Sequence, residues 1–230
     1  MKKANGEKSF RLDGVQLSDQ FQSRTVDLSR IAQFCDAVNK NGEGIIDPSA
    51  HLTCYQVKRP RPDERHEVIS IDQFSDFEVN GPQQLTVHKR KTQLCVPSAG
   101  ILETSPTPTP TGGGGGGSFA TLDHFELYQA NTTNGTPRFD RREVSINDPF
   151  MNITIPLELK KPVALGVPTN KNGEGIFNSV THLTCYSVRA PRFEKQHVDG
   201  NNQFGDFRVR ARKPNMLCVP SFKEVLDDDD

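Results

Sequence analysis

The sequence predicts an all-β protein that contains the same unit twice, and three observations support this prediction. Apolar and polar residues alternate over short stretches, as in half-buried strands, and no stretch keeps a helical period for three turns. The motif Asn-Lys-Asn-Gly-Glu-Gly-Ile occurs at residues 39–45 and 170–176, followed by His-Leu-Thr-Cys-Tyr at 51–55 and 182–186. Both offsets are 131 residues (170 − 39 and 182 − 51), which indicates a tandem duplication.

Length and composition are consistent with two small domains. The 230 residues suggest two units of about 100 residues each. We expect the boundaries at 1–98 for the first unit, 99–121 for a linker, 122–223 for the second unit and 224–230 for an acidic tail. Only 33% of the residues are hydrophobic and tryptophan is absent, so each unit buries a small core that benefits from covalent cross-links.

The strands of the first unit follow from its alternation. Between residues 9 and 29, Phe10, Leu12, Val15 and Leu17 point to one side. The glycine-rich residues 39–44 are expected to form a loop. Further strands are expected at residues 52–57, 66–72, 76–80 and 84–90, with a turn at 80–82.

The linker separates the units with a Pro/Thr stretch followed by six glycines, and we expect residues 104–118 to have no secondary structure. The relative placement of the two units is therefore expected not to be fixed. Pro/Thr linkers of this kind are common between domains of exported proteins.

Each unit is itself expected to be a pair of half-repeats forming a small sandwich or barrel. Residues 123–128 resemble 181–186, and 161–168 match 213–220 at a constant offset of 52 (213 − 161). In these alignments Leu127 and Gly166 stand where cysteines would be. The joint absence of both members of a pair indicates a disulfide, because a single leftover thiol would be a liability.

This pattern predicts two disulfides, Cys54–Cys95 and Cys185–Cys218, and leaves Cys35 unpaired. Cys35 aligns with Gly166, so its partner would precede Phe10. We therefore expect that the chain lacks the start of its first repeat, which would also explain why no signal peptide is visible.

The repeated pattern, with His-Leu-Thr-Cys-Tyr, Asn-Gln-Phe-Gly-Asp-Phe at 202–207 and Leu-Cys-Val-Pro-Ser at 94–98 and 217–221, resembles an uncharacterised family of tandem repeat domains. These domains occur in predicted exported bacterial and archaeal proteins. The resemblance covers nearly the whole chain outside the linker and tail. It implies secretion and a repeat architecture, and it supplies no functional residues.

Zinc is the alternative role for the cysteines. Each unit has two histidines and two cysteines: His51, Cys54, His66 and Cys95 in the first, and His182, Cys185, His197 and Cys218 in the second. An odd spacing along a strand places His51 and Cys54 on opposite faces, however. The retention of His124 where the cysteines are missing also favours disulfides over zinc.

Calcium is a second metal to consider. The repeated loop has oxygen-bearing side chains at alternate positions: Asn39, Asn41 and Glu43, with copies starting at Asn170. Ala50 and Thr181 stand where a bidentate glutamate should close the loop. A connector that needs Gly44 for a positive φ angle explains the same pattern.

A basic stripe is expected on one strand, where Arg208, Arg210 and Arg212 alternate, with Lys89 to Lys91 as a weaker counterpart. Such a stripe can hold anionic sugars or other polyanions. A charged edge strand that prevents aggregation gives the same pattern.

The sequence favours no enzyme activity and no cofactor. No nucleophile elbow, phosphate loop or metalloprotease motif is present, and Cys35 resembles a strand end more than a nucleophile. The net charge of −1 indicates no general attraction to nucleic acid or membranes, and no apolar run approaches the ~20 residues of a membrane span.

These features predict a non-catalytic module of an extracellular or cell-surface protein, serving as a spacer, assembly or adhesion element. Its partners would be other cell-surface proteins or polysaccharide. A sugar- or polyanion-binding module that uses the arginine stripe is the alternative function, and the cytoplasm is the alternative location.

Overall fold

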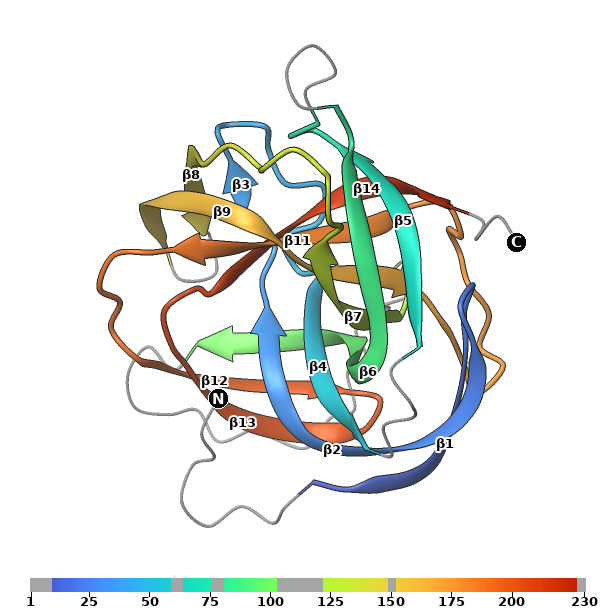
Figure 1. The fold of residues 1–230 in the computed structure, drawn as a ribbon. Helices are drawn as coiled ribbons and strands as arrows, with labels where there is room; N and C mark the ends of the chain where they lie inside the picture. The colour runs from blue at the N-terminus through green and yellow to red at the C-terminus, as the bar shows by residue number, and fades with distance from the viewer. Residues whose placement is uncertain (1–9, 59–63, 76–80, 103–121, 149–151, 227–230) are drawn as a thin grey trace.

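The computed structural model describes residues 10–58, 64–75, 81–102, 122–148 and 152–226, and every regular element in these ranges is a β-strand (Figure 1). The all-β prediction is confirmed. Within the same ranges, no helix is long and apolar enough to cross a membrane. The expected strand at 76–80, linker residues 104–118 and tail residues 227–230 lie outside the described residues.

The first unit contributes strands β1 Leu12–Ser18, β2 Ser23–Cys35, β3 Asn39–Lys40, β4 His51–Lys58, β5 Arg65–Asp72 and β6 Gln83–Leu102. Strand β6 is longer than the segment expected at 84–90 and continues past residue 98. The first two residues of the expected loop at 39–44 form the short strand β3. Gly81 has a φ angle of 62°, in agreement with the expected turn before β6.

The second unit contributes β7 Phe125–Thr132, β8 Arg142–Asp148, β9 Ile153–Pro168, β10 Asn170–Lys171, β11 His182–Arg189, β12 Gln196–Asn202, β13 Gly205–Ala211 and β14 Met216–Val225. Apart from β7, its strands correspond to those of the first unit in order. Strands β1 to β5 match β8 to β12, and the long strand β6 matches β13 and β14 together.

The pairing inside each unit is the same. Strand β4 pairs with the C-terminal part of β6 as β11 pairs with β14, and β5 pairs with the N-terminal part of β6 as β12 pairs with β13. Ten residues separate β5 from β6, whereas two separate β12 from β13, so the length difference between the units falls mainly in this turn.

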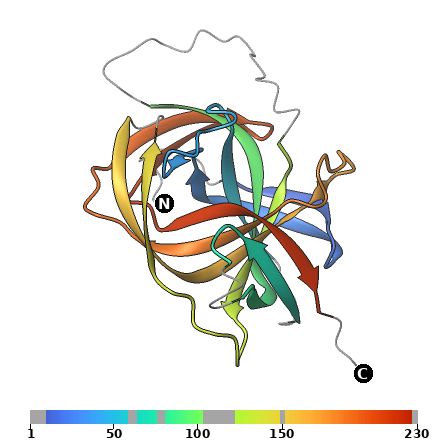
Figure 2. The ribbon, with the colours of Figure 1, turned by 90° about the horizontal axis from the view of Figure 1, so that it is seen from above.

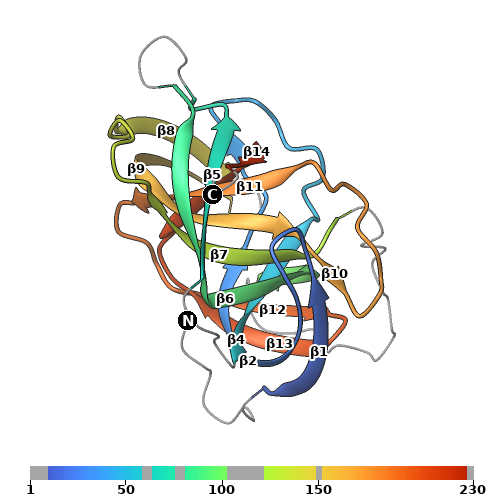
Figure 3. The same ribbon diagram turned by 45° about the vertical axis from the view of Figure 1, so that its right-hand side comes forward.

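Strands of the two units are hydrogen-bonded to one another throughout the sheet. Strand β1 pairs with β10, β3 with β8, β5 with β14, and β6 with both β7 and β12. The red strand β14 therefore lies beside the teal strand β5 in Figure 2, and β10 lies next to β1 in Figure 3. The expectation that the relative placement of the units is not fixed is wrong, because hydrogen bonds along these strands hold one unit against the other.

Two hydrophobic cores have matching residues. One contains Val15, Leu17, Val26, Leu28, Tyr55, Leu94 and Val96. The other contains, at equivalent positions, Val144, Ile146, Leu157, Leu159, Tyr186, Leu217 and Val219. A phenylalanine from the opposite unit completes each core: Phe204 packs against the first and Phe74 belongs to the second.

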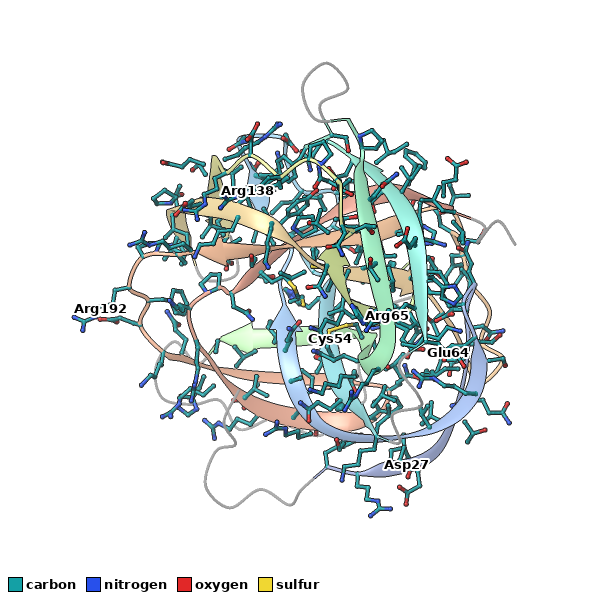
Figure 4. All side chains as sticks on the ribbon, in the orientation of Figure 1. Asp27, Cys54, Glu64, Arg65, Arg138 and Arg192 are labelled. Atoms are coloured by element: carbon teal, nitrogen blue, oxygen red, sulfur yellow. A yellow bond between two sulfur atoms is a disulfide. The ribbon has the colours of Figure 1, made fainter. Side chains whose placement is uncertain are left out.

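Both expected disulfides are present between directly opposed residues, Cys54 with Cys95 and Cys185 with Cys218. Cys54, labelled in Figure 4, lies near the middle of the molecule. The cysteines share one apolar cluster with residues of β7 and β9. Leu127 lies directly opposite Gly166, so these two residues hold the position that the disulfides hold elsewhere.

Candidate functional site

The repeated loop of each unit holds a strand of the other unit. Asn41 accepts a hydrogen bond through Oδ1 from the backbone N–H of Ser145 at 2.9 Å, and its own N–H donates to the Ser145 carbonyl at 2.8 Å. Asn172 makes the same two bonds with Gln16, both at 2.9 Å. One asparagine side chain thus extends the β3·β8 pairing and its copy extends β10·β1.

Both asparagines adopt a φ angle of 52°, a left-handed conformation that asparagine tolerates better than most residues. The same loops are closed internally by Asn39 and Asn170, whose side chains accept hydrogen bonds from Gly44 and Gly175. The repeated motif therefore encodes a turn that presents one asparagine to the opposite unit.

The lysine of each loop is buried and paired. Lys40 and Lys171 form ion pairs with Glu43 and Glu174, three residues later. Each ammonium also lies over a phenylalanine ring, 5.5 Å from the centroid of Phe74 for Lys40 and 5.7 Å from that of Phe204 for Lys171. A buried ammonium is costly unless it is paired, and the carboxylate and the ring both offset that cost.

Each of these phenylalanines enters an aromatic triad with two residues of the opposite unit. Phe204 lies edge-on to Tyr55, with centroids 5.3 Å apart, and 5.9 Å from Phe10. In the matching triad, Phe74 lies edge-on to Tyr186 at 5.2 Å and 6.4 Å from Phe139. Edge-to-face pairs of this kind contribute about 0.5–1.5 kcal/mol beyond the area they bury.

A polar side chain two residues before each phenylalanine bonds the tyrosine of the triad. The Tyr186 hydroxyl donates to Asp72 at 2.7 Å, and the Asn202 amide donates to the Tyr55 hydroxyl at 2.9 Å. Burial raises the pKa of Asp72 and raises the pKa of Tyr55 to about 12. We call the two sets of residues, from loop asparagine to triad, the reciprocal junction.

A buried ion pair adds to this junction. The guanidinium of Arg24 on β2 pairs with the carboxylate of Glu126 on β7 and donates to Thr92 at 2.8 Å. Burial raises the pKa of Glu126, and the charge of Arg24 opposes that rise. The pair joins the two units, and removing one partner would leave a buried charge without compensation.

The calcium interpretation is wrong for the repeated loop. Asn39 and Asn41 use their side-chain oxygens for backbone N–H groups, and Glu43 pairs with Lys40. The second loop uses Asn170, Asn172 and Glu174 in the same way. The candidate ligands therefore close the turn and join the units.

The zinc interpretation is also wrong, because Cys54, Cys95, Cys185 and Cys218 are all in disulfides. Three of the four histidines of that set have other contacts: His51 lies 2.7 Å from Asp36, His66 stacks on Phe21, and His182 bonds the Val180 carbonyl. The fourth, His197, faces Arg210 across β12 and β13. Among the described residues, no group of three histidine, cysteine or acidic side chains could hold a metal ion.

The arginine stripe lies on β13, which pairs with β12 alone among the described strands and is therefore an edge. Arg208 and Arg210 alternate with the buried residues Val209 and Ala211, so they face away from the core, and Arg212 follows exposed. Arg208 lies 3.4 Å from Asp199 on β12.

Sequence reasoning did not single out Lys40, Asn172 or the residue pair Phe74 and Phe204 as contacts between units. Their signal was present, since the tip Asp-Gln-Phe at 72–74 and Asn-Gln-Phe at 202–204 repeats with a phenylalanine inside a turn. A large apolar residue inside a turn indicates that the turn is covered by another part of the protein.

A scan of protein-family models, a search of curated proteins and a search of solved structures each found no match to this chain.

Proposed function

We propose that the chain is a non-catalytic module of an exported or cell-surface protein, in which two units joined as one body serve as a spacer, assembly or adhesion element. The observation that supports this proposal is the use of the repeated motif. Asn41 and Asn172 bind backbone groups of the opposite unit, and the buried lysines beside them are neutralised within their own loops. The most distinctive residues of the repeat thus stabilise the junction and are not available to a substrate.

Export is supported by the cysteines. Two disulfides join residues in the interior, and disulfides persist in oxidising compartments and are rare in the cytosol. Only 33% of the residues are hydrophobic, so the apolar core is small and the disulfides add stability that the core alone does not supply.

The proposal is tested in cells of the organism that encodes the chain. We expect trypsin added to intact cells to digest the protein, and a maleimide polymer to label one thiol per denatured chain. Five reactive thiols in protein that is protected inside intact cells would overturn the proposal.

The structural part of the proposal is tested by the surface level of a junction variant. We expect Asn41→Ala with Asn172→Ala to lower the amount of intact protein at the cell surface. Asn134→Ala, an exposed loop residue outside the junction, is the matched control and should leave the amount unchanged.

Polyanion binding by the arginine stripe is a second candidate, favoured by the outward position of Arg208, Arg210 and Arg212 on an edge strand. Retention on heparin should then fall when all three are changed to serine. If retention on heparin is unchanged in this variant, the arginine stripe is not a polyanion-binding site.

A further inference from the structure

A cleft of about 700 Å³ lies where β2, β4 and β6 of the first unit meet β7, β9 and β11 of the second. Both units supply lining residues at equivalent positions, Gln56 with Ser187 and Thr92 with Asn215. The cleft is therefore composite, and the pairing of β6 with β7 brings the two units together beside it. Interfaces between packed units are preferred places for ligand sites.

The two disulfides support the floor of this cleft from both sides. Gln56 lies directly opposite Gln93, two residues along the strands from Cys54–Cys95. Ser187 lies directly opposite Met216, two residues from Cys185–Cys218. Residues two apart on a strand share a face, so both pairs stand beside a covalent cross-link that fixes their strands. A site held this way loses little conformational freedom when it binds a ligand.

Four glutamines from neighbouring strands line the cleft: Gln33 on β2, Gln56 on β4, Gln93 on β6 and Gln129 on β7. The side-chain carbonyl oxygens of Gln33 and Gln93 are buried and accept no hydrogen bond from the described residues. Leaving a buried acceptor unpaired costs about 1–3 kcal/mol, so both amides have free energy to gain from a donor. Because these oxygens are out of contact with solvent, a ligand reaches them only when the amide groups turn toward the cleft. Side-chain amides both donate and accept, which matches a hydroxyl group. The oxygen of Gln56 already accepts a hydrogen bond from Arg30 at 2.9 Å, so Gln56 offers its NH2 group as a donor.

The charge of the lining limits the ligand further. Lys58 and Lys91 line the cleft, and no aspartate or glutamate does so among the described residues. A cationic ligand is therefore disfavoured. The rest of the lining mixes amide and hydroxyl side chains with apolar ones, namely Val57, Leu127, Val163, Ala164 and Met216. Such a mixture suits a sugar, whose C–H groups can pack on apolar side chains while its hydroxyl groups bond the amides.

We propose that this cleft binds a hydroxyl-rich saccharide, neutral or acidic, through the amides of Gln33, Gln56, Gln93 and Gln129. The inference goes beyond the structural role proposed above, because a spacer needs no such site. It also differs from the arginine stripe, which lies on β13 and lines no part of the cleft.

The test titrates the full chain by calorimetry and by backbone NMR shifts with cellotetraose, chitotetraose, mannotetraose and tetragalacturonate at millimolar concentration. We expect at least one of them to bind and to shift the amides of β4, β6 and β11. The variant Gln56→Leu with Gln93→Leu should raise its dissociation constant at least about tenfold, since two hydrogen-bonding side chains are lost.

Gln73→Leu is the matched control, an exposed glutamine in the turn after β5 and outside the cleft, and it should leave binding unchanged. Gln129→Leu removes an exposed amide of the cleft on β7, so it should weaken binding severalfold, and it serves as the test if the double variant unfolds. The inference would be overturned if none of the four sugars gave a binding signal in either measurement. It would also be overturned if the cleft variants bound the sugar as tightly as the wild type. Loss of binding on changing Arg208, Arg210 and Arg212 to serine, with the cleft variants intact, would assign the sugar to the stripe instead.

Discussion

The side-chain amide of Asn202 donates a hydrogen bond to the hydroxyl of Tyr55, 2.9 Å away in the opposite unit. At the matching position Asp72 accepts a hydrogen bond from Tyr186 at 2.7 Å. The two halves of the reciprocal junction therefore use the same geometry with an amide in one and a carboxyl group in the other. The backbone N–H groups of Phe204 and Phe74 also donate to these side chains, at 2.9 and 2.8 Å.

This equivalence predicts the effect of Asp72→Asn. Burial raises the pKa of Asp72, so the stability associated with this group is present at low pH and is lost as pH rises through that pKa. Asparagine keeps the shape and the backbone contact without an ionised state. We expect a free energy of unfolding in urea at pH 7 that equals or exceeds that of the wild type, with the difference shrinking in acid. A clear loss of stability at pH 7 would show that the carboxylate itself is required.

From the aromatic triads we expect Phe74→Ala to lower the free energy of unfolding strongly. The side chain is buried in the core of the second unit although it belongs to the first, and deleting a buried phenylalanine costs about 3–5 kcal/mol. We expect such a loss in urea unfolding, with both units still unfolding in one transition. The control is Phe177→Ala, since Phe177 is 67% exposed, and its effect should stay within about 0.5 kcal/mol.

His124 predicts an acid sensitivity. Burial, with the charge of Lys171, lowers the pKa of His124 to about 4, against the opposing charges of Glu174 and Asp123. The unfolded chain takes up the proton near pH 6.5 and the folded chain does not, so stability present above pH 6.5 is lost as pH falls towards 4. The loss amounts to at most about 3 kcal/mol.

The measurement is the free energy of unfolding of wild type and His124→Gln across this range. The variant should show a shallower decline, and the remainder would include His182, whose pKa burial also lowers. Parallel curves for the two proteins would contradict the assignment to His124.

Cys35 is expected to be the one thiol of the protein and to react slowly with alkylating reagents. Burial raises the pKa of Cys35 to about 11, so about one molecule in a thousand carries the reactive thiolate at pH 8. Iodoacetamide should label Cys35 slowly in the folded protein and rapidly in denaturant. Peptide mapping without reduction should recover Cys54 with Cys95 and Cys185 with Cys218, and any other pairing would be inconsistent with the fold.

Local patterns were sufficient for the strands and for the half-repeats. The alignment that left Leu127 and Gly166 without cysteines predicted a matched pair, and the structure places them directly opposite each other. The alternation of polar and apolar residues also predicted the ends of β4 and β5 to within one or two residues. This is possible because each strand's own pattern determines which of its side chains face the core.

The junction could not be predicted in this way. Strands β5 and β12 present the same alternation whether they pair inside their own unit or across to β14 and β6, and they do both. Because the two units have similar sequences, the alternation of polar and apolar residues fits pairing within a unit and pairing between units equally well. From the sequence alone, Asn41 fits a calcium ligand or a turn residue, because its partner Ser145 lies 104 residues away. The cleft depends on the same long-range pairing.

If the two units form one body through the reciprocal junction, they should stay together when the chain between them is cut. A protease site inserted at the glycines 112–117 allows the purified protein to be cleaved and then passed over a sizing column without denaturant. We predict that the two fragments elute together at the volume of the uncut protein and separate only in denaturant. Fragments that separate under native conditions would show that the junction does not hold the two units together.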